Sequence, residues 1–210
     1  MEEVLPGIWR WVVEDEEGIS MSSYAFLTAQ GALIVDPAWD AEAVARLERA
    51  AGPMLIVIST QSHARDARRF QDRLAAPIAA SARAARDLQG INRTLARDET
   101  LPGGWRVLAA PGVYAGEIAL YRPEGGGVLY VGDLFVTQTQ GALPGQGATP
   151  AAALLPERLR SDPPQLQETL GRLTELPFET VLTGHGPPIL AGGRHRVRAL
   201  VLGRSAGQEG

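Results

Sequence analysis

The sequence contains no cysteine, no lysine and only three histidines. Without cysteine the chain can form no disulfide, no thiolate metal site and no cysteine nucleophile. The histidines are His63, His185 and His195, so any centre that needs more than three imidazoles is excluded. All twenty basic residues are arginine.

Long hydrophobic runs are also missing. No apolar run reaches the roughly 18 residues that a membrane-spanning helix needs. The first residues, MEEVLPGIWRW, are acidic and lack the apolar core of a signal peptide. A formal net charge of −4 gives no reason to expect a nucleic-acid or membrane-surface partner. The sequence therefore predicts a cytoplasmic protein.

The 210 residues include 45% hydrophobic and 21% charged residues, which is typical of a globular α/β chain. Strands are predicted at residues 4–13, 22–28 and 32–35, before any helix, and strands return from residue 105 to residue 133. Each of these β-rich stretches is followed by an α/β passage. We expect two similar halves, each a sheet with helices on one side, forming a single domain over residues 1–203 with a disordered tail at 204–210.

Capping and periodicity predict the helices. Asp40 is an N-cap candidate for a helix that carries Val44 and Leu47 on one face. A second helix should carry Ala67, Phe70 and Leu74, and helices are also expected after Asp162-Pro163 and over residues 193–202. A short buried strand is predicted over residues 54–58. Residues 138–156 are rich in Gly, Pro, Gln and Ala and predict a long loop.

Five segments at strand ends carry a resemblance to a known family. They are ALIVDP (32–37), IVISTQSHARDARRF (56–70), APGVYAGEIALY (110–121), LYVGDLF (129–135) and VLTGHGPPIL (181–190). In this order and spacing they resemble the metallo-β-lactamase superfamily over nearly the whole chain. The resemblance implies a four-layer αββα sandwich of two mixed β-sheets with helices on the outer faces. It also implies a metal site where the strand ends meet.

In active members of that family two divalent metals share an aspartate, and histidines with one further aspartate complete the ligand shells. Compared with those motifs, the two histidine positions Gln61 and Val113 have lost their imidazole. Arg65 stands where the motif has its aspartate, and Asp66 where it has its third histidine. The family's remaining ligands are retained as His63, Asp133 and His185. The resemblance therefore implies a cleft lined by Gln61, His63, Arg65, Asp66, Val113, Asp133 and His185.

The substitutions leave two main functions open. Valine cannot bind a metal and a guanidinium has no lone pair to offer, so no dinuclear zinc centre is expected. The first interpretation is a protein of hydrolase ancestry, catalytically impaired or non-catalytic, with no cofactor and a retained cleft for an unknown small molecule. The alternative is a mononuclear hydrolase of an ester, thioester, lactone or phosphoester. It would hold one weak zinc, manganese or iron ion at Asp66, Asp133 and His185, with His63 as a possible fourth ligand. A purely structural or oligomeric role has no positive support.

Single residues also carry alternatives. His63 is either a ligand or a hydrogen-bonded loop histidine, and Asp66 is either a ligand or an N-cap. Arg65 either replaces the lost metal charge by pairing with Asp133 or Asp66, or points into solvent. We expect Gln61, His63, Asp66, Val113, Asp133 and His185 to converge at one sheet edge.

Overall fold

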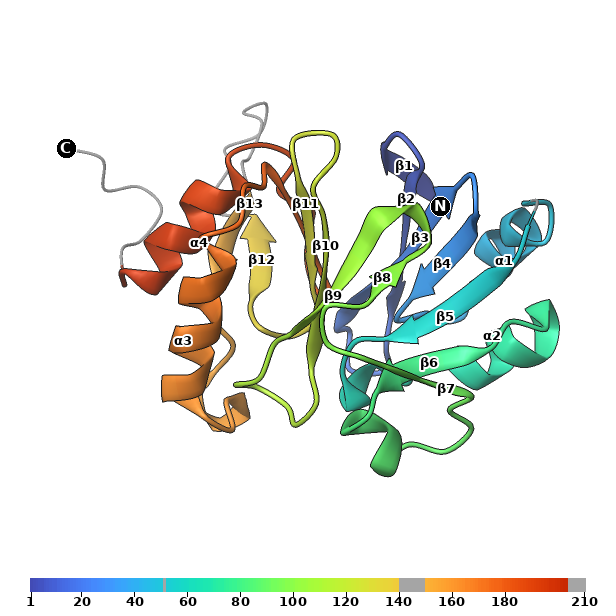
Figure 1. Cartoon of the computed structure of the whole chain (residues 1–210), viewed down its shortest axis with the longest axis horizontal. Helices are drawn as coiled ribbons and strands as arrows, with labels where there is room; N and C mark the ends of the chain where they lie inside the picture. The colour runs from blue at the N-terminus through green and yellow to red at the C-terminus, as the bar shows by residue number, and fades with distance from the viewer. Residues whose placement is uncertain (51, 140–149, 204–210) are drawn as a thin grey trace.

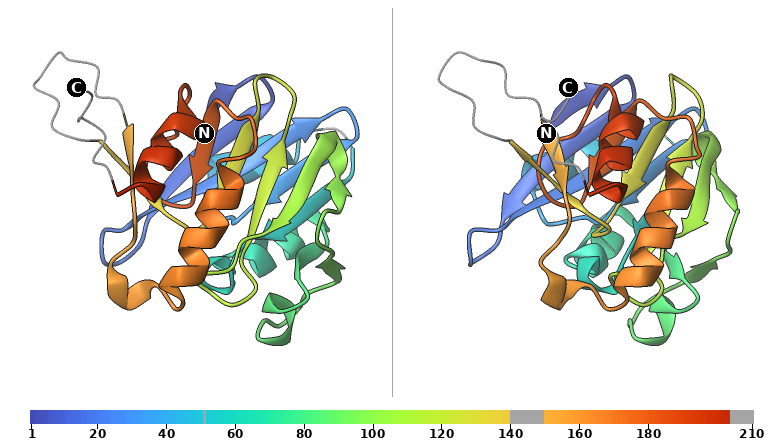
Figure 2. Two further views of the ribbon diagram at one scale, coloured as in Figure 1. Left: turned by 60° about the vertical axis from the view of Figure 1, so that its left-hand side comes forward. Right: turned by 90° about the vertical axis from the view of Figure 1, so that its left-hand side faces the viewer.

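The structure, a computed structural model, describes residues 1–50, 52–139 and 150–203. Four layers follow one another in Figure 1: two helices, a seven-stranded sheet, a five-stranded sheet and two more helices. This is the αββα sandwich that the order of motifs predicts. Both views in Figure 2 show α3 and α4 together on the outer face of the second sheet.

The first sheet contains its strands in sequence order. They are β1 (Glu2–Leu5), β2 (Ile8–Glu14), β3 (Ser20–Thr28), β4 (Gly31–Val35), β5 (Met54–Ile58), β6 (Ile78–Ser81) and β7 (Arg93–Leu95). Pairing is antiparallel from β1 to β4 and parallel from β4 to β7. Because β4 and β5 run in parallel, the residues that follow them meet at one edge of the sheet.

The second sheet has the order β14-β11-β10-β9-β8. Its strands are β8 (Thr100–Leu101), β9 (Trp105–Ala109), β10 (Ile118–Arg122), β11 (Val128–Val131) and β14 (Thr180–Thr183). Among the described residues of this sheet, β11 and β14 pair in parallel and the other neighbouring strands are antiparallel. The residues that follow these two strands therefore also meet at one edge, opposite the ends of β4 and β5.

The predicted loop over residues 138–156 is wrong at both of its ends. Strand β12 (Val136–Thr139) pairs with β13 (Pro150–Ala153) in an antiparallel hairpin, and residues 140–149 lie outside the described residues. A side-chain contact fixes this hairpin to the second sheet, because the Thr137 hydroxyl donates to the Pro187 carbonyl at 2.5 Å. The short 3₁₀ helix η4 (Glu157–Leu159) follows it.

The helices begin close to their predicted positions. Asp40 caps α1 (Ala41–Leu47) by accepting from the Ala43 N–H at 2.7 Å. Asp162 caps α3 (Pro163–Leu173) in the same way. The other two helices are α2 (Ala67–Leu74) and α4 (Gly193–Val201). The remaining short 3₁₀ helices are η1 (Gln61–His63), η2 (Ala84–Arg86) and η3 (Pro102–Gly104).

Successive side chains of a strand point to opposite faces of its sheet, so the buried residues form three core layers. Tyr24 and Phe26 of β3 face the second sheet, while Ala25 between them faces α1 and α2. Phe26 stacks on Trp105 of the opposite sheet with ring centroids 4.0 Å apart. The apolar residues of α3 and α4 close the outer face of the second sheet. This packing fixes both sheets against each other, and so fixes the strand ends that carry the site.

Two expectations need smaller corrections. The single strand predicted over 4–13 is a hairpin, because Gly7 turns the chain between β1 and β2 with a φ of 76°. Between β6 and β8 the chain forms η2 and β7, where the sequence predicted no element. The predicted tail at 204–210 lies outside the described residues. Among the residues described, no helix is both long and apolar enough to cross a membrane.

Candidate metal centre

His63 is placed at the edge between the sheets by the turn that follows β5. The chain leaves the strand at Ser59 and Thr60 and forms η1, whose last residue is His63. The side chain is only 2% exposed. Gly184, after β14, makes room for the ring, since a Cβ there would lie 2.4 Å from His63 Cε1.

Asp36, which directly follows β4, fixes the orientation of the His63 ring. Its Oδ2 lies 2.7 Å from His63 Nδ1 and accepts hydrogen bonds from the Ser59 and Tyr130 hydroxyls. Its Oδ1 accepts from the Ser59 N–H. The pKa of Asp36 is lowered: burial opposes ionisation, but His63, Arg65 and these hydrogen bonds outweigh it. An ionised carboxylate can only accept, so Nδ1 carries a proton and Nε2 is the atom left for other chemistry.

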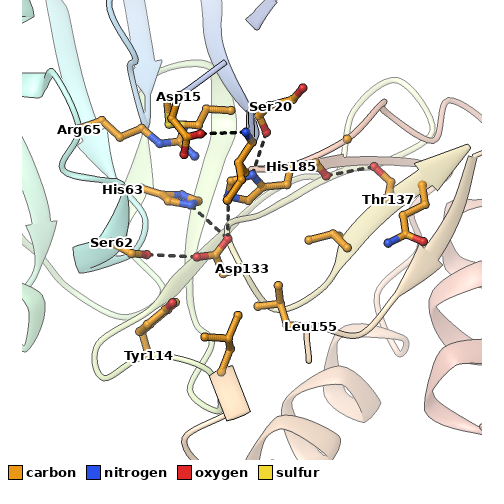
Figure 3. A pocket seen from close by; sticks show the side chains of 16 residues that line it. Asp15, Ser20, Ser62, His63, Arg65, Tyr114, Asp133, Thr137, Leu155 and His185 are labelled. Atoms are coloured by element: carbon orange, nitrogen blue, oxygen red, sulfur yellow. Dashed lines mark hydrogen bonds and ion pairs between the residues drawn. The ribbon is translucent and has the colours of Figure 1, made fainter. Parts of the chain in front are cut away.

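His185 is fixed in the same way from the other half of the fold. Its Nδ1 lies 2.8 Å from the backbone carbonyl of Ser20, which can only accept. His185 Nε2 therefore presents a lone pair when the ring is neutral. Asp133, which follows β11, accepts from the Ser62 hydroxyl through Oδ2 at 3.1 Å, and its Oδ1 remains directed toward the two histidines (Figure 3).

The three free atoms point toward one another. Asp133 Oδ1 lies 3.1 Å from His63 Nε2 and 3.4 Å from His185 Nε2. Both distances are those of ion pairs, yet neither contact has hydrogen-bond geometry, and His63 Nε2 and Asp133 Oδ1 are buried without a hydrogen-bond partner. With both rings neutral, three acceptors face one centre. Such an arrangement needs a cation, either a proton or a metal ion.

The arrangement fits a metal ion. All three ligand atoms lie within 4.8 Å of one another. In a tetrahedral shell with bonds of about 2.0–2.1 Å, neighbouring ligand atoms are about 3.3 Å apart. The two separations from Asp133 Oδ1, 3.1 and 3.4 Å, match that value. Two imidazoles and a carboxylate are ligands for zinc or iron.

Without a metal, the same atoms hold a proton. Burial disfavours the charged form of His63, but Asp36 and Asp133 outweigh it and raise its pKa to about 9. Burial also opposes ionisation of Asp133, and His63, His185 and Ser62 still lower its pKa. The pKa of His185 is lowered, chiefly by burial. A protonated His63 between two carboxylates is therefore the metal-free state of the site.

Sequence reasoning missed Glu117, which is buried beside Asp133. Its Oε1 accepts a hydrogen bond from the Asp133 N–H at 2.7 Å, and Glu117 is only 2% exposed. Burial and the charge of Asp133 raise its pKa to about 8. The one available signal was a charged residue directly before the apolar strand IALY. Glu117 holds the backbone that carries Asp133.

Arg65 takes neither of the two positions expected for it. Its guanidinium donates to the backbone carbonyls of Ser22 and Asp36, both at 3.0 Å, and lies 3.5 Å from the carbonyl of Gly184. In the part of the chain that the structure describes, it forms no ion pair with Asp133 or Asp66. The reason is that His63 already occupies the space beside Asp133. Arg65 instead joins strand ends from both sheets.

The remaining motif positions do not reach the centre. Asp66 Oδ2 accepts from the Trp39 N–H at 2.8 Å, which makes Asp66 neither a ligand nor a side-chain cap of α2. Val113 is buried in the core between the second sheet and its helices. Gln61 is half-buried, and its Oε1 has no hydrogen-bond partner. The structure thus brings together His63, Asp133 and His185, and leaves Gln61, Asp66 and Val113 outside.

The centre opens into a cavity of about 520 Å³. The polar side chains that line the cavity include Ser62, Tyr114 and the three residues of the cluster, which are His63, Asp133 and His185 (Figure 3). The β12–β13 hairpin and the segment after it form the opposite wall. Burial, Asp133 and Glu117 raise the pKa of Tyr114, so its phenol stays protonated.

Solved structures resemble this chain over most of its length. A metallo-beta-lactamase family protein from Thermus thermophilus is 20% identical, with a TM-score of 0.69, covering 96% of this chain and 80% of the other. A metallo-beta-lactamase from Pontibacter korlensis is 16% identical, with a TM-score of 0.72, covering 97% and 98%. A HARLDQ-motif metallo-beta-lactamase from Cronobacter sakazakii is 16% identical, with a TM-score of 0.60, covering 87% and 76%. At these identities the likeness shows the fold.

The comparison with curated proteins finds no match. The family assignment comes from the sequence itself, through the family model described as the metallo-beta-lactamase superfamily, which matches residues 4–203. The αββα layers and the His63–Asp133–His185 cluster at the strand ends agree with that match. The chain therefore belongs to the metallo-beta-lactamase superfamily.

Proposed function

We propose that this protein is a hydrolase that uses one divalent metal ion, held by His63, Asp133 and His185. The observation that carries the proposal is the convergence of His63 Nε2, Asp133 Oδ1 and a His185 ring nitrogen within 4.8 Å of one another, the first two buried without a hydrogen-bond partner. A protein that had only to keep its fold would satisfy such atoms with donors. The open side of the cluster faces a cavity large enough for a small molecule.

The number of ligands favours catalysis over a structural role. Structural zinc sites are closed by four protein ligands, whereas catalytic sites have three and leave a position for water or substrate. When bound, a divalent ion lowers the pKa of water enough to supply hydroxide near neutral pH. Asp36 and the Ser20 carbonyl hold both rings with Nε2 turned inward, which keeps the site ready for the ion.

Two further side chains complete the site. The Ser62 hydroxyl holds Asp133 Oδ2, which leaves Oδ1 free for the ion. The Tyr114 hydroxyl is directed toward Ser62 and Asp133 in Figure 3. A protonated phenol at this wall donates a hydrogen bond to the negative charge that develops on a carbonyl oxygen under attack.

Metal stoichiometry and metal-dependent hydrolysis test the proposal together. The protein, stripped with a chelator and dialysed, is titrated with zinc, manganese and ferrous iron in a calorimeter. We expect one equivalent of at least one of these metals, and hydrolysis of an activated ester that appears with the metal and disappears with chelator. Two equivalents, or no binding at any pH from 7 to 9, would overturn the proposal.

A second candidate function is a metal-free binding protein. The observation in its favour is the raised pKa of His63, because an imidazolium between Asp36 and Asp133 balances charge without a metal. In that case the cavity binds a small molecule and does no chemistry. The same titration separates the two candidates, since this one requires that none of the three metals binds.

A further inference from the structure

We propose that the cavity accepts the apolar acyl group of an uncharged carboxylic ester, thioester or lactone, and not a phosphoester. This inference rests on the proposed function for the reaction. It goes beyond it by choosing among the substrate classes that the family resemblance leaves open. Three observations carry it: the composition of the walls, the exposed residues at the mouth, and the balance of charge around the centre.

The walls opposite the metal ligands are apolar. They come from the residues around the start of β3, from β12 and from the segment between β13 and the end of η4, which are separate segments of the chain. The residues are Ile19, Met21, Val136, Leu155 and Leu159. Polar groups are concentrated at the strand ends, where the reaction takes place. A substrate that fits has its reacting carbonyl at the ligands and its apolar part against this wall.

Two residues at the cavity are unusually exposed for their type. Ile19 is 47% exposed and Leu159 is 38% exposed, and they come from opposite halves of the fold. Exposed apolar side chains gathered at a cavity mark a place where an apolar ligand covers them. An apolar chain that lies along these lining residues would cover both. An acyl group of several methylenes has that reach.

The charges around the centre leave no excess for an anionic substrate. Three carboxylates, Asp15, Asp36 and Asp133, lie in or next to the cavity, and Arg65 is the cation among its described lining residues; Arg10, which donates to the lining Gly186 carbonyl, is balanced by its ion pair with Glu2. A divalent ion at the ligands brings this inventory to neutrality. Any ionisation of Glu117 would make it negative. A phosphate group would enter without a surplus cation to pair with it.

Arg65 does not change that conclusion. Both protons of its Nη1 are donated to the carbonyls of Ser22 and Asp36, so this nitrogen has none left for a ligand. Its Nη2 lies beside the carbonyl of Gly184. Phosphate recognition by arginine uses two parallel N–H donors from one guanidinium. The fork between Nη1 and Nη2 is committed to the backbone here, because both Nη1 protons and one Nη2 proton are donated to carbonyls.

A series of esters tests the inference on the metal-loaded protein. We would measure kcat/KM for p-nitrophenyl acetate, butyrate, hexanoate and octanoate, and for p-nitrophenyl phosphate. Burying a methylene is worth about a fourfold gain, so kcat/KM should rise about fourfold per methylene until the cavity is full. The phosphoester should be the poorest substrate. A flat series, or a phosphoester cleaved faster than the hexanoate, would overturn the inference.

Wall variants locate the effect. Ile19→Ser and Leu159→Ser should each lower kcat/KM for the octanoate about tenfold, mainly through KM, and lower it much less for the acetate. Leu190→Ser is the matched control, because Leu190 is 49% exposed and lies outside the cavity. It should behave as the parent protein. Equal losses in all three variants would contradict a role for the cavity wall.

A binding measurement separates this inference from the proposed reaction. The neutral fluorescent probe N-phenyl-1-naphthylamine should bind the metal-free protein, lose affinity in Ile19→Ser and Leu159→Ser, and be displaced by octanoate esters. Binding without hydrolysis would support the apolar cavity and reject the hydrolase. Hydrolysis without dependence on chain length or on the two variants would support the hydrolase and reject the apolar cavity.

Discussion

The motif position that carries valine and the motif positions that carry aspartate and histidine differ in what surrounds them. At Val113 the core between the second sheet and its helices has closed around the side chain. At Asp133 and His185 the side chains still face the cavity, and Asp133 Oδ1 is buried without a hydrogen-bond partner. Packing has therefore closed the site at Val113 but not at Asp133 and His185.

This difference explains how one site can remain after several substitutions. In the family pattern the three retained residues serve two metals, with the aspartate between them. Here His63 Nε2 and His185 Nε2 both approach the same oxygen, Asp133 Oδ1. The ligands that survive from two sets thus define one centre. The comparison predicts that variants of Asp133 and His185 lower the affinity for metal. Variants of Val113 should change only the free energy of unfolding.

The largest effect is expected from Asp133→Asn. An amide replaces the charged ligand that lies closest to both imidazoles, so zinc affinity should fall at least about a thousandfold. Asp66→Asn is the matched control, because that carboxylate accepts from the Trp39 N–H and not from the centre. Calorimetric zinc titration of both variants measures the difference. Equal losses in the two variants would break the comparison.

The second effect is a fall in the stability of the metal-free protein as pH rises. His63 has a pKa of about 9 in the fold against 6.5 for the free side chain, so the folded state binds the proton more tightly. This contribution is fully present below pH 6.5 and is lost as pH rises through 9. Glu117, raised from 4.5 to about 8, acts in the same direction at lower pH.

Urea denaturation in the presence of chelator measures this slope. The free energy of unfolding should fall by on the order of 5 kcal/mol between pH 6.5 and 9, somewhat more than half of it from His63 and the rest from Glu117. His63→Gln should flatten the curve only in part, because Glu117 titrates over much of the same range. Saturating zinc should also flatten it, since a metal-bound His63 carries no proton to lose. A parent protein equally stable at pH 6.5 and 9 would disprove the assignment.

Much of the fold followed from local sequence. The strand Met54–Ile58 was predicted at its observed bounds because Gly52-Pro53 and Ser59-Thr60 enclose an apolar run. The hairpin of β12 and β13 was missed because its stability is not local. Thr137 ties it to the carbonyls of His185 and Pro187, about fifty residues away in sequence, and no periodicity within the hairpin reports that contact.

The sequence predicted where the site lies in the fold, but not how its side chains are oriented. Parallel strands bring Asp36 and His63 to one edge, and Asp133 and His185 to the facing edge, which motif order alone indicates. The direction of Arg65 depends on its backbone, whose φ of 36° turns the side chain toward Ser22 and Asp36. Such a local backbone choice leaves no trace in residue spacing.

A third prediction concerns the residue behind the ligands. Asp36→Asn should weaken zinc binding about 10- to 100-fold, because the amide cannot accept from the His63 Nδ1–H and the neighbouring hydroxyls together. The left-handed φ of 49° at this position is tolerated by asparagine, so the backbone should not change. Circular dichroism checks the fold before the zinc titration. An unchanged affinity would show that ring orientation does not depend on Asp36.

The smallest effect is expected at Arg65. If it replaced the metal charge beside Asp133, its removal would strand a buried carboxylate and cost about 3–5 kcal/mol. The structure instead gives it backbone carbonyls as partners, whose loss costs about 1–2 kcal/mol. Arg65→Gln should therefore lower the free energy of unfolding by about that amount. The exposed Arg68→Gln should change it by less than about 0.5 kcal/mol.

A double mutant decides between the two roles of Arg65. Arg65→Gln and Asp133→Asn should be additive in the metal-free protein, because the two side chains do not touch. A coupling energy above about 1 kcal/mol would instead show that the guanidinium compensates Asp133. Zinc affinity gives an independent check, because Arg65 binds the strand ends that carry Ser22 and Asp36 and is not itself a ligand. Zinc affinity should fall less in Arg65→Gln than in Asp36→Asn. The first variant removes hydrogen bonds to the backbone around the site, whereas the second removes a direct contact to His63.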